Sequence, residues 1–328
     1  MDECPFILVP QLSVHPDRMN ITTQCIWLED RRRGKSIASI LNSDHKHNDK
    51  VSDQAARKIQ KAIRYLLFFA NDKKAYSHTN GLMFKFKICF VTLTLSSTQV
   101  HSDNEIKSKL LNQFFVEARQ KWGVSKYVWR AEKQNNGNVH FHILTDRFIP
   151  WSELRDVWNR IQNKLGYVDR YKDNQQLFFK NGFKLRMDLL QKWPEKEQHR
   201  AYVQGSKKSW NSPNSTDVHS LQHVHKVAEY LTKYMQKESQ TKGLIGRLWG
   251  CSSTLSDIKG AQTDIDSKIA DELNKLRSIY KPFEVRKDYF SILFVNIQQV
   301  FKAGCVALTA LIVEYFATNF NHYIQLVT

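Results

Sequence analysis

The sequence predicts an α+β fold in which helices pack on a central antiparallel sheet. Segments rich in β-branched and aromatic residues at 85–95, 126–133 and 139–145 are typical of strands. The segments 105–122 and 152–165 instead carry apolar residues at helical spacing. Because strand, helix, hairpin and helix follow one another, we expect one antiparallel sheet with helices on a face.

Composition narrows the class of protein before any motif is considered. The chain has 328 residues, with 49 Lys+Arg against 32 Asp+Glu and a formal net charge of +17. Hydrophobic residues make up 41%, which is ordinary for a globular protein and excludes a chain that is disordered or membrane-embedded throughout. The positive charge favours a polyanionic partner, with nucleic acid first and an anionic membrane surface second.

Cysteines and apolar segments bear on the compartment. The five cysteines are widely spaced and form no CxxC pair, so a zinc ribbon or disulfide framework is not expected and a reduced, cytoplasmic setting is. The start of the chain lacks the pattern of a signal peptide. The apolar stretch 303–318 is shorter than the roughly 20 residues of a membrane span. It predicts a buried or partner-packed helix, and membrane association is not expected.

The first elements can be justified in chain order. Residues 1–50 are polar and without period, so we predict a loosely ordered N-terminal segment. No phosphate-binding loop precedes Gly34, because Glu29 stands where a second glycine is required, and no small-molecule cofactor is expected. Residues 52–70 form an amphipathic helix, 85–95 (KFKICFVTLTL) a strand, and 105–122 a helix that stops at Gly123.

The later elements complete one domain, predicted to span 51–259. Two strands, 126–133 and 139–145, flank the turn sequence Asn-Asn-Gly-Asn at 135–138 and form a hairpin. A helix follows from a serine cap at Ser152 to Gly166. Residues 167–215 show little period and predict an insertion of loops and short elements. Residues 217–237 look helical in their second half, after a short strand, and 260–328 predict a C-terminal helical extension.

The hairpin carries the first candidate site. His140 and His142 are two apart on a strand and therefore share a face, while Phe141 points to the core. The turn places Glu132 of the partner strand near His140. Two imidazoles and one carboxylate make a plausible three-ligand site for a divalent metal. The alternative is that the strand simply carries two solvent-facing histidines.

A second candidate site lies on the predicted helix near residue 230. At about 100° per residue, one face of this helix carries two tyrosines and several lysines. A tyrosine hydroxyl with its ordinary pKa of about 10 is a poor nucleophile, and a metal-bound phosphate and a lysine would activate it. The alternative is two half-buried tyrosines beside solvated lysines. The residues of this face are Lys226, Tyr230, Lys233, Tyr234 and Lys237.

Together these pieces resemble the HUH endonuclease superfamily, specifically its rolling-circle replication initiators, the replication-associated proteins of single-stranded DNA phages and plasmids. That family shows three motifs in order: a strand ending in threonines, a two-histidine strand and a Tyr-x-x-Lys helix. They are matched by residues 90–95 (FVTLTL), by His140-Phe141-His142 and by 230–233 (YLTK). Residues 247–250 (RLWG) are similar to a stretch of the phage and plasmid members. The resemblance implies a ferredoxin/RRM-like core and covers roughly 85–255.

The resemblance also implies a reaction. The family nicks one strand of single-stranded origin DNA, leaving a 5′-phosphotyrosine link and a free 3′-OH that primes rolling-circle replication. Tyr230 would be the leading nucleophile, Lys233 would stabilise the developing charge, and Tyr234 is a candidate second nucleophile. Glu132, His140 and His142 would hold Mg²⁺ or Mn²⁺, while Lys226 and Lys237 would contact DNA. Host replication machinery is the expected protein partner.

Two other functions remain open from the sequence. A non-catalytic DNA-binding protein or repressor on the same fold would show the same charge and pattern. A single-strand transposase of the same superfamily is the other, although the doubled tyrosine and the length argue against it. Four tryptophans could stack on unpaired bases, although core packing is expected for most of them: Trp122, Trp129, Trp151 and Trp158.

Overall fold

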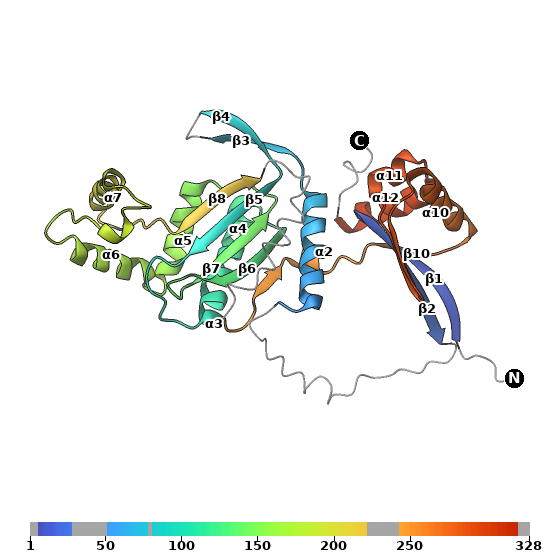
Figure 1. Cartoon of the computed structure of the whole chain (residues 1–328), viewed down its shortest axis with the longest axis horizontal. Coiled ribbons are helices and arrows are strands. Elements are labelled where there is room, and N and C mark those ends of the chain that lie inside the picture. The colour runs from blue at the N-terminus through green and yellow to red at the C-terminus, as the bar shows by residue number, and fades with distance from the viewer. Residues whose placement is uncertain (1–5, 28–50, 78–80, 222–242, 321–328) are drawn as a thin grey trace. The chain divides into compact units, whose positions relative to one another are not determined.

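The computed structural model describes residues 6–27, 51–77, 81–221 and 243–320. The chain separates into two compact units, one formed by residues 47–256 and the other by 1–46 together with 257–328. Figure 1 colours both units along the chain. The larger unit contains the predicted hairpin and is described first.

A five-stranded antiparallel sheet forms the centre of the larger unit. Its strand order is β8-β5-β7-β6-β9, so the two hairpin strands lie next to the threonine-bearing strand. The short turn of the hairpin pairs Glu132 with His140, as the sequence predicted. The strands are β5 (Ile88–Thr94), β6 (Tyr127–Lys133), β7 (Val139–Thr145), β8 (Thr216–Leu221) and β9 (Trp249–Cys251).

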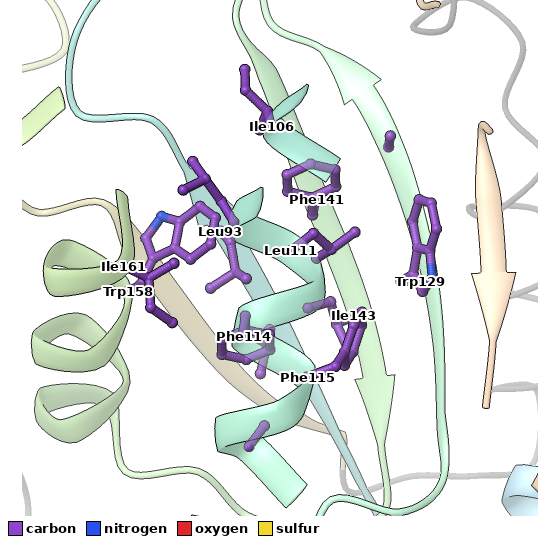
Figure 2. Packing of buried hydrophobic residues seen from close by; sticks show 14 of the residues in the cluster. Leu93, Ile106, Leu111, Phe114, Phe115, Trp129, Phe141, Ile143, Trp158 and Ile161 are labelled. Carbon is purple, nitrogen blue, oxygen red and sulfur yellow. The ribbon is translucent and has the colours of Figure 1, made fainter. Parts of the chain in front are cut away.

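Alternate residues of these strands face a hydrophobic core. Leu93, Phe141 and Trp129 pack in one buried cluster with side chains of two helices, α4 and α5 (Figure 2). The Trp158 ring meets Phe141 edge-on at a centroid distance of 6.5 Å, and its indole N–H donates to the Thr94 carbonyl at 2.7 Å. A buried indole therefore finds its hydrogen-bond partner without leaving the apolar cluster.

The helices on this face follow the predicted pattern with local differences. The predicted helix 105–122 is three consecutive pieces, with a π-helical turn in the middle, and it ends at Gly123 with a left-handed φ of 66°. The predicted serine cap at Ser152 is wrong, because the cap residue is Pro150 and makes no side-chain hydrogen bond. These elements are α3 (Asp103–Ile106), η1 (Lys107–Leu111), α4 (Asn112–Trp122) and α5 (Trp151–Asn163).

The leading helix and a small hairpin complete the front of the unit. Helix α2 (Asp53–Phe69) begins at Ser52, whose hydroxyl accepts from the Ala55 N–H at 3.2 Å. Strands β3 (Lys73–Ser77) and β4 (Leu82–Phe86) pair with each other in a separate two-stranded sheet. Phe84 packs edge-on against Phe148, which follows β7, so this hairpin is attached to the unit by aromatic contacts.

The predicted insertion at 167–215 is more helical than its sequence suggested. It contains α6 (Tyr167–Phe178), η2 (Met187–Leu189) and α7 (Glu195–Lys207). Helices α6 and α7 have few buried residues, so their apolar periodicity is weak. The pattern test failed there because it detects burial against a core, and these helices bury little. A short helix α9 (Ser253–Ser256) ends the unit.

The smaller unit is built around a second antiparallel sheet of order β10-β1-β2-β12-β11. This corrects the prediction for residues 6–27, which were expected to be loosely ordered and instead form a long hairpin. It also joins segments that the prediction had separated into 1–50 and 260–328. Its strands are β1 (Phe6–His15), β2 (Arg18–Trp27), β10 (Ala261–Asp264), β11 (Glu284–Lys287) and β12 (Phe290–Leu293).

Three helices, α10 (Ser267–Tyr280), α11 (Ile297–Lys302) and α12 (Val306–Phe320), accompany this sheet. The apolar stretch near 303–318 is mostly α12, and its Leu308, Ile312 and Phe316 are buried. The Glu272 carboxylate accepts from the N–H groups of Ala307 and Leu308, both at 2.9 Å, and so caps this helix. Among the described residues, no helix is long and apolar enough to cross a membrane.

Candidate metal centre

The face of the sheet opposite the hydrophobic core carries the polar residues of the three central strands. Pairing places Thr92 next to His142 and Thr94 next to His140. On the other side, Arg130 pairs with His142. The strand period of two therefore converts alternation in the sequence into two rows of polar side chains on one surface.

Three side chains converge on one point of this surface. The Glu132 Oε2 lies 3.3 Å from the Nε2 of His140 and 3.2 Å from the Nε2 of His142, and the two Nε2 atoms are 3.0 Å apart. Adjacent ligands of a six-coordinate ion with bonds of about 2.1 Å lie about 3 Å apart. The three atoms therefore form one triangular face around a candidate divalent ion, as the two-histidine, one-carboxylate prediction requires.

Burial and charge keep the carboxylate ionised. Glu132 is only 1% exposed. Burial raises its pKa, but hydrogen bonds from His140 and His142 and the positive charge of Arg130 outweigh burial and lower the pKa to about 2. Arg130 is fully buried on the same strand, with its Nε 3.5 Å from the Glu132 Oε1. A carboxylate that stays charged is the form that binds a cation.

The histidines differ in how firmly they are held. Burial lowers the pKa of His142 and favours the neutral form that ligates metals, although the bond with Glu132 opposes this. Its Nδ1 lies 3.1 Å from the Thr92 hydroxyl, which can accept or donate and so suits either ring tautomer. His140 is more exposed, and its Nδ1 has no hydrogen-bond partner among the described residues.

Thr92 and Arg130 are the site residues that sequence reasoning missed. Thr92 was part of the first motif, but its role as the hydrogen-bond partner of His142 depends on the strand order. Arg130 lies two residues before Glu132, and that spacing placed it on the same face in advance. The signal was present in both cases: polar residues alternate with apolar ones on a strand whose other face is buried.

A second polar cluster attaches the chain after residue 242 to this sheet. Asp103 is buried and accepts from the Ile245 N–H at 3.0 Å and from the Lys133 ammonium at 2.8 Å. Lys107 donates to the Ile245 carbonyl at 2.7 Å, and burial lowers the pKa of its ammonium to about 8. Strand β9, from the predicted RLWG stretch, then pairs with β6. The described chain thus returns to the strand that bears Glu132.

The remaining predicted site residues lie outside the described part of the chain. These are Lys226, Tyr230, Lys233, Tyr234 and Lys237, which fall in residues 222–242. The described residues on either side end at opposite edges of the sheet, with β8 next to β5 and β9 next to β6. Of the four tryptophans, Trp158 and Trp129 are buried in the core and Trp122 packs against it, whereas Trp151 is half exposed.

The fold and the site define an α+β domain with a candidate three-ligand metal centre on its sheet. Residues 88–239 of this domain match the family model of the replication-associated protein ORF2/gene 2 protein. The match runs from β5 through the metal hairpin and the insertion to the segment with the paired tyrosines. It confirms the resemblance to replication-associated proteins and is consistent with a rolling-circle replication initiator. No curated protein and no solved structure gives a significant match to the chain.

Proposed function

We propose that this protein is a replication initiator of the HUH type that nicks single-stranded origin DNA and remains joined to the 5′ end. The observation that carries the proposal is the convergence of Glu132, His140 and His142 within a segment similar to replication-associated proteins. A domain that only binds DNA would not require a buried carboxylate held beside two imidazoles. The metal would be Mg²⁺ or Mn²⁺, with histidine ligands favouring manganese somewhat.

The proposed reaction is a transesterification. The Tyr230 oxygen attacks the scissile phosphorus, a phosphotyrosine bond forms, and the bond to the 3′ oxygen breaks to leave a free 3′-OH. A bound divalent ion would orient and polarise the phosphate. Lys233 would favour the phenolate, and Lys226 and Lys237 would contact the DNA backbone. The net charge of +17 supports a sequence-independent grip on phosphates.

Residue roles in this proposal follow from where each group lies. Glu132, His140 and His142 would hold the ion, Thr92 would orient His142, and Arg130 would keep Glu132 ionised. Tyr234 would act as a second nucleophile, which permits two linked cleavages in one replication cycle. The free 3′-OH would serve host replication enzymes in the cytoplasm.

The test is a covalent-adduct assay. Single-stranded oligonucleotides tiled across the DNA element that encodes the chain are incubated with the protein and Mn²⁺, and adducts are resolved under denaturing conditions. We expect an adduct in the wild type that is lost with EDTA, in His142→Ala and in Tyr230→Phe. An adduct that survives each single tyrosine variant but not the Tyr230→Phe/Tyr234→Phe double variant would assign two nucleophiles.

The control is His219→Ala, which removes an exposed histidine of β8 and leaves the triad intact. This variant should form the adduct normally. If the wild type binds the oligonucleotides but forms no adduct with any of them, the protein is a DNA-binding protein or repressor, and the nicking proposal is wrong.

A further inference from the structure

The insertion between the second and third motifs encloses a cavity that the proposed nicking reaction does not use. Its volume is about 820 Å³, within the range of ligand-binding sites. Its walls come from α6, α7, the loop between them and the start of α5. Figure 1 shows α6 and α7 beside α5 and β8, on the side of the sheet away from α2. We call this cavity the insertion pocket.

The charge of the insertion pocket has one sign. Its lining includes several cations and no aspartate or glutamate among the described residues. The Arg155 guanidinium lies 4.6 Å from the centre of the Trp151 ring, and its Nε is buried without a hydrogen-bond partner among the described residues. A one-signed cavity with an unsatisfied guanidinium nitrogen suits an anionic ligand. The cations are Arg155, Lys184, Arg186, Lys207 and Lys208.

Aromatic rings make up much of the remaining wall. Trp193 is 51% exposed and Trp151 is 52% exposed, so both present ring surface to a ligand. Deeper in the wall, Trp210 stacks on Phe179 at a centroid distance of 5.1 Å and an interplanar angle of 6°. Cations interleaved with exposed aromatic rings are the combination that binds unpaired nucleotides, because bases stack on rings while phosphates pair with cations.

The backbone is arranged to hold these rings in place. Ser209 and Trp210 both have left-handed φ values, 48° and 58°, in positions where glycine is the usual residue. A Cβ on Gly205 would lie 2.0 Å from the Trp210 ring, so only glycine permits this packing. Such strain persists where surrounding contacts impose it, and it frequently accompanies binding sites.

One buried side chain fixes the loop that carries Trp193. The Gln198 amide of α7 accepts from the Arg186 N–H at 2.9 Å and donates to the carbonyls of Arg186 and Trp193 at 3.0 and 2.8 Å. The loop is therefore tied to the helix at both ends of the segment 186–193. The ring and the cations of the pocket wall are pre-organised, which reduces the entropy cost of binding.

The insertion pocket begins where the metal-bearing strands end. Its lining includes Leu95 and Ser96, which follow Thr94 directly, and Thr94 pairs with His140. Asn214 also lines it, two residues before β8. A strand of DNA held in the pocket would thus enter at the end of the sheet where His140 lies.

We propose that the insertion pocket binds unpaired bases of single-stranded DNA, stacking them on Trp193 and Trp151 and pairing their phosphates with Arg155 and Lys184. The choice of DNA as the ligand rests on the proposed function. The binding itself needs no metal, because none of the three candidate metal ligands lines the pocket.

The test measures binding of fluorescein-labelled oligo(dT) by fluorescence anisotropy in EDTA. The pocket variant is Trp193→Ala/Lys184→Ala, and the matched control is Leu177→Ala/Lys180→Ala, which removes an exposed apolar residue and a lysine outside the pocket. We expect affinity to fall about tenfold or more in the pocket variant. The slope of log affinity against log salt should decrease by about 0.7. The control should bind like the wild type, and thermal unfolding should show both variants folded.

Three outcomes would overturn the inference: a pocket variant that binds like the control, an equal loss of affinity for duplex DNA of the same length, or a clear preference of the wild type for oligo(U). The metal-site variant His142→Ala separates this inference from the nicking proposal. It should bind oligo(dT) in EDTA like the wild type yet form no adduct. If the wild type itself forms no adduct while the pocket variant still loses affinity, the nicking proposal fails and the pocket assignment stands.

Discussion

The two faces of the central sheet are made by the same three strands and have opposite chemistry. On one face, Phe141 is fully buried among aliphatic and aromatic side chains. On the other, its neighbours His140 and His142 approach Glu132. The comparison shows that one short segment specifies both a hydrophobic core and a candidate site. Substitutions on the first face should affect folding, and those on the second should affect the metal.

The largest expected effect comes from Phe141→Ala. Removing this ring leaves a cavity among Trp129, Trp158 and their neighbours, which should cost about 3–5 kcal/mol of unfolding free energy. Chemical denaturation measures it. The adjacent His142→Ala should cost far less stability while abolishing tight Mn²⁺ binding in calorimetry. Equal destabilisation by both substitutions would contradict the division between the faces.

Gly250→Ala tests how closely β9 approaches the core face. A Cβ at this position would lie 2.6 Å from the Trp129 Nε1, so we expect overpacking to cost about 1–3 kcal/mol. Thermal unfolding measures the loss. In the Trp129→Phe background the smaller ring makes room, so the same substitution should cost less. A fully additive double variant would show that the contact is not responsible.

Thr92→Val sharpens the metal face. The substitution keeps the shape of the side chain but removes the hydroxyl that lies 3.1 Å from the His142 Nδ1. Loss of such a partner of a metal-bound histidine should weaken Mn²⁺ affinity about 10–100-fold, with little change in stability. Calorimetric titration provides the measurement, and Thr92→Ser, which retains the hydroxyl, is the control. Equal affinity in Thr92→Val and wild type would remove Thr92 from the site.

The smallest effect is a pH dependence of the metal-free protein. The pKa of Glu132, raised by burial but lowered more by His140, His142 and Arg130, is about 2, below the unfolded value of about 4.3. Its stabilisation is therefore complete above about pH 4.3 and is lost as the pH falls toward about 2. The lowered pKa of His142 acts in the same direction, because the unfolded imidazole takes up protons below about pH 6.5.

Thermal unfolding across this range checks the expectation. The difference in Tm between wild type and Glu132→Gln should shrink as the pH falls from about 4.3 toward about 2. The exposed Glu197→Gln should show no such convergence. A difference that stays constant with pH would mean that the charge of Glu132 does not stabilise the fold.

Local sequence patterns predicted the central sheet and the metal centre because both depend on near neighbours. The turn at 135–138 is short, so the pairing of Glu132 with His140 follows from counting residues along the hairpin. The helix 52–70 and the stop at Gly123 were likewise readable, since caps and left-handed glycines act within a few residues. Residues 230–237 lie outside the described part of the chain, so their predicted roles remain predictions.

Long-range contacts decided what the patterns did not. Residues 6–27 form strands because β1 pairs with β10 and β2 with β12, partners that lie more than half the chain away in sequence. Hydrophobic periodicity cannot report a partner that distant. The insertion pocket depends on the same kind of information, since Trp210 meets Phe179 only after α7 has folded back.

The amino-acid sequence by itself determined the two-faced hairpin, its three metal-ligand candidates and the class of protein, because alternation, turn chemistry and motif order are written in consecutive residues. Only the tertiary structure decided the strand order that brings Thr92 to His142, the buried contact of Arg130 with Glu132, and the cation-lined pocket of the insertion. Those features require residues far apart in the chain to meet, and their meeting is set by packing in three dimensions.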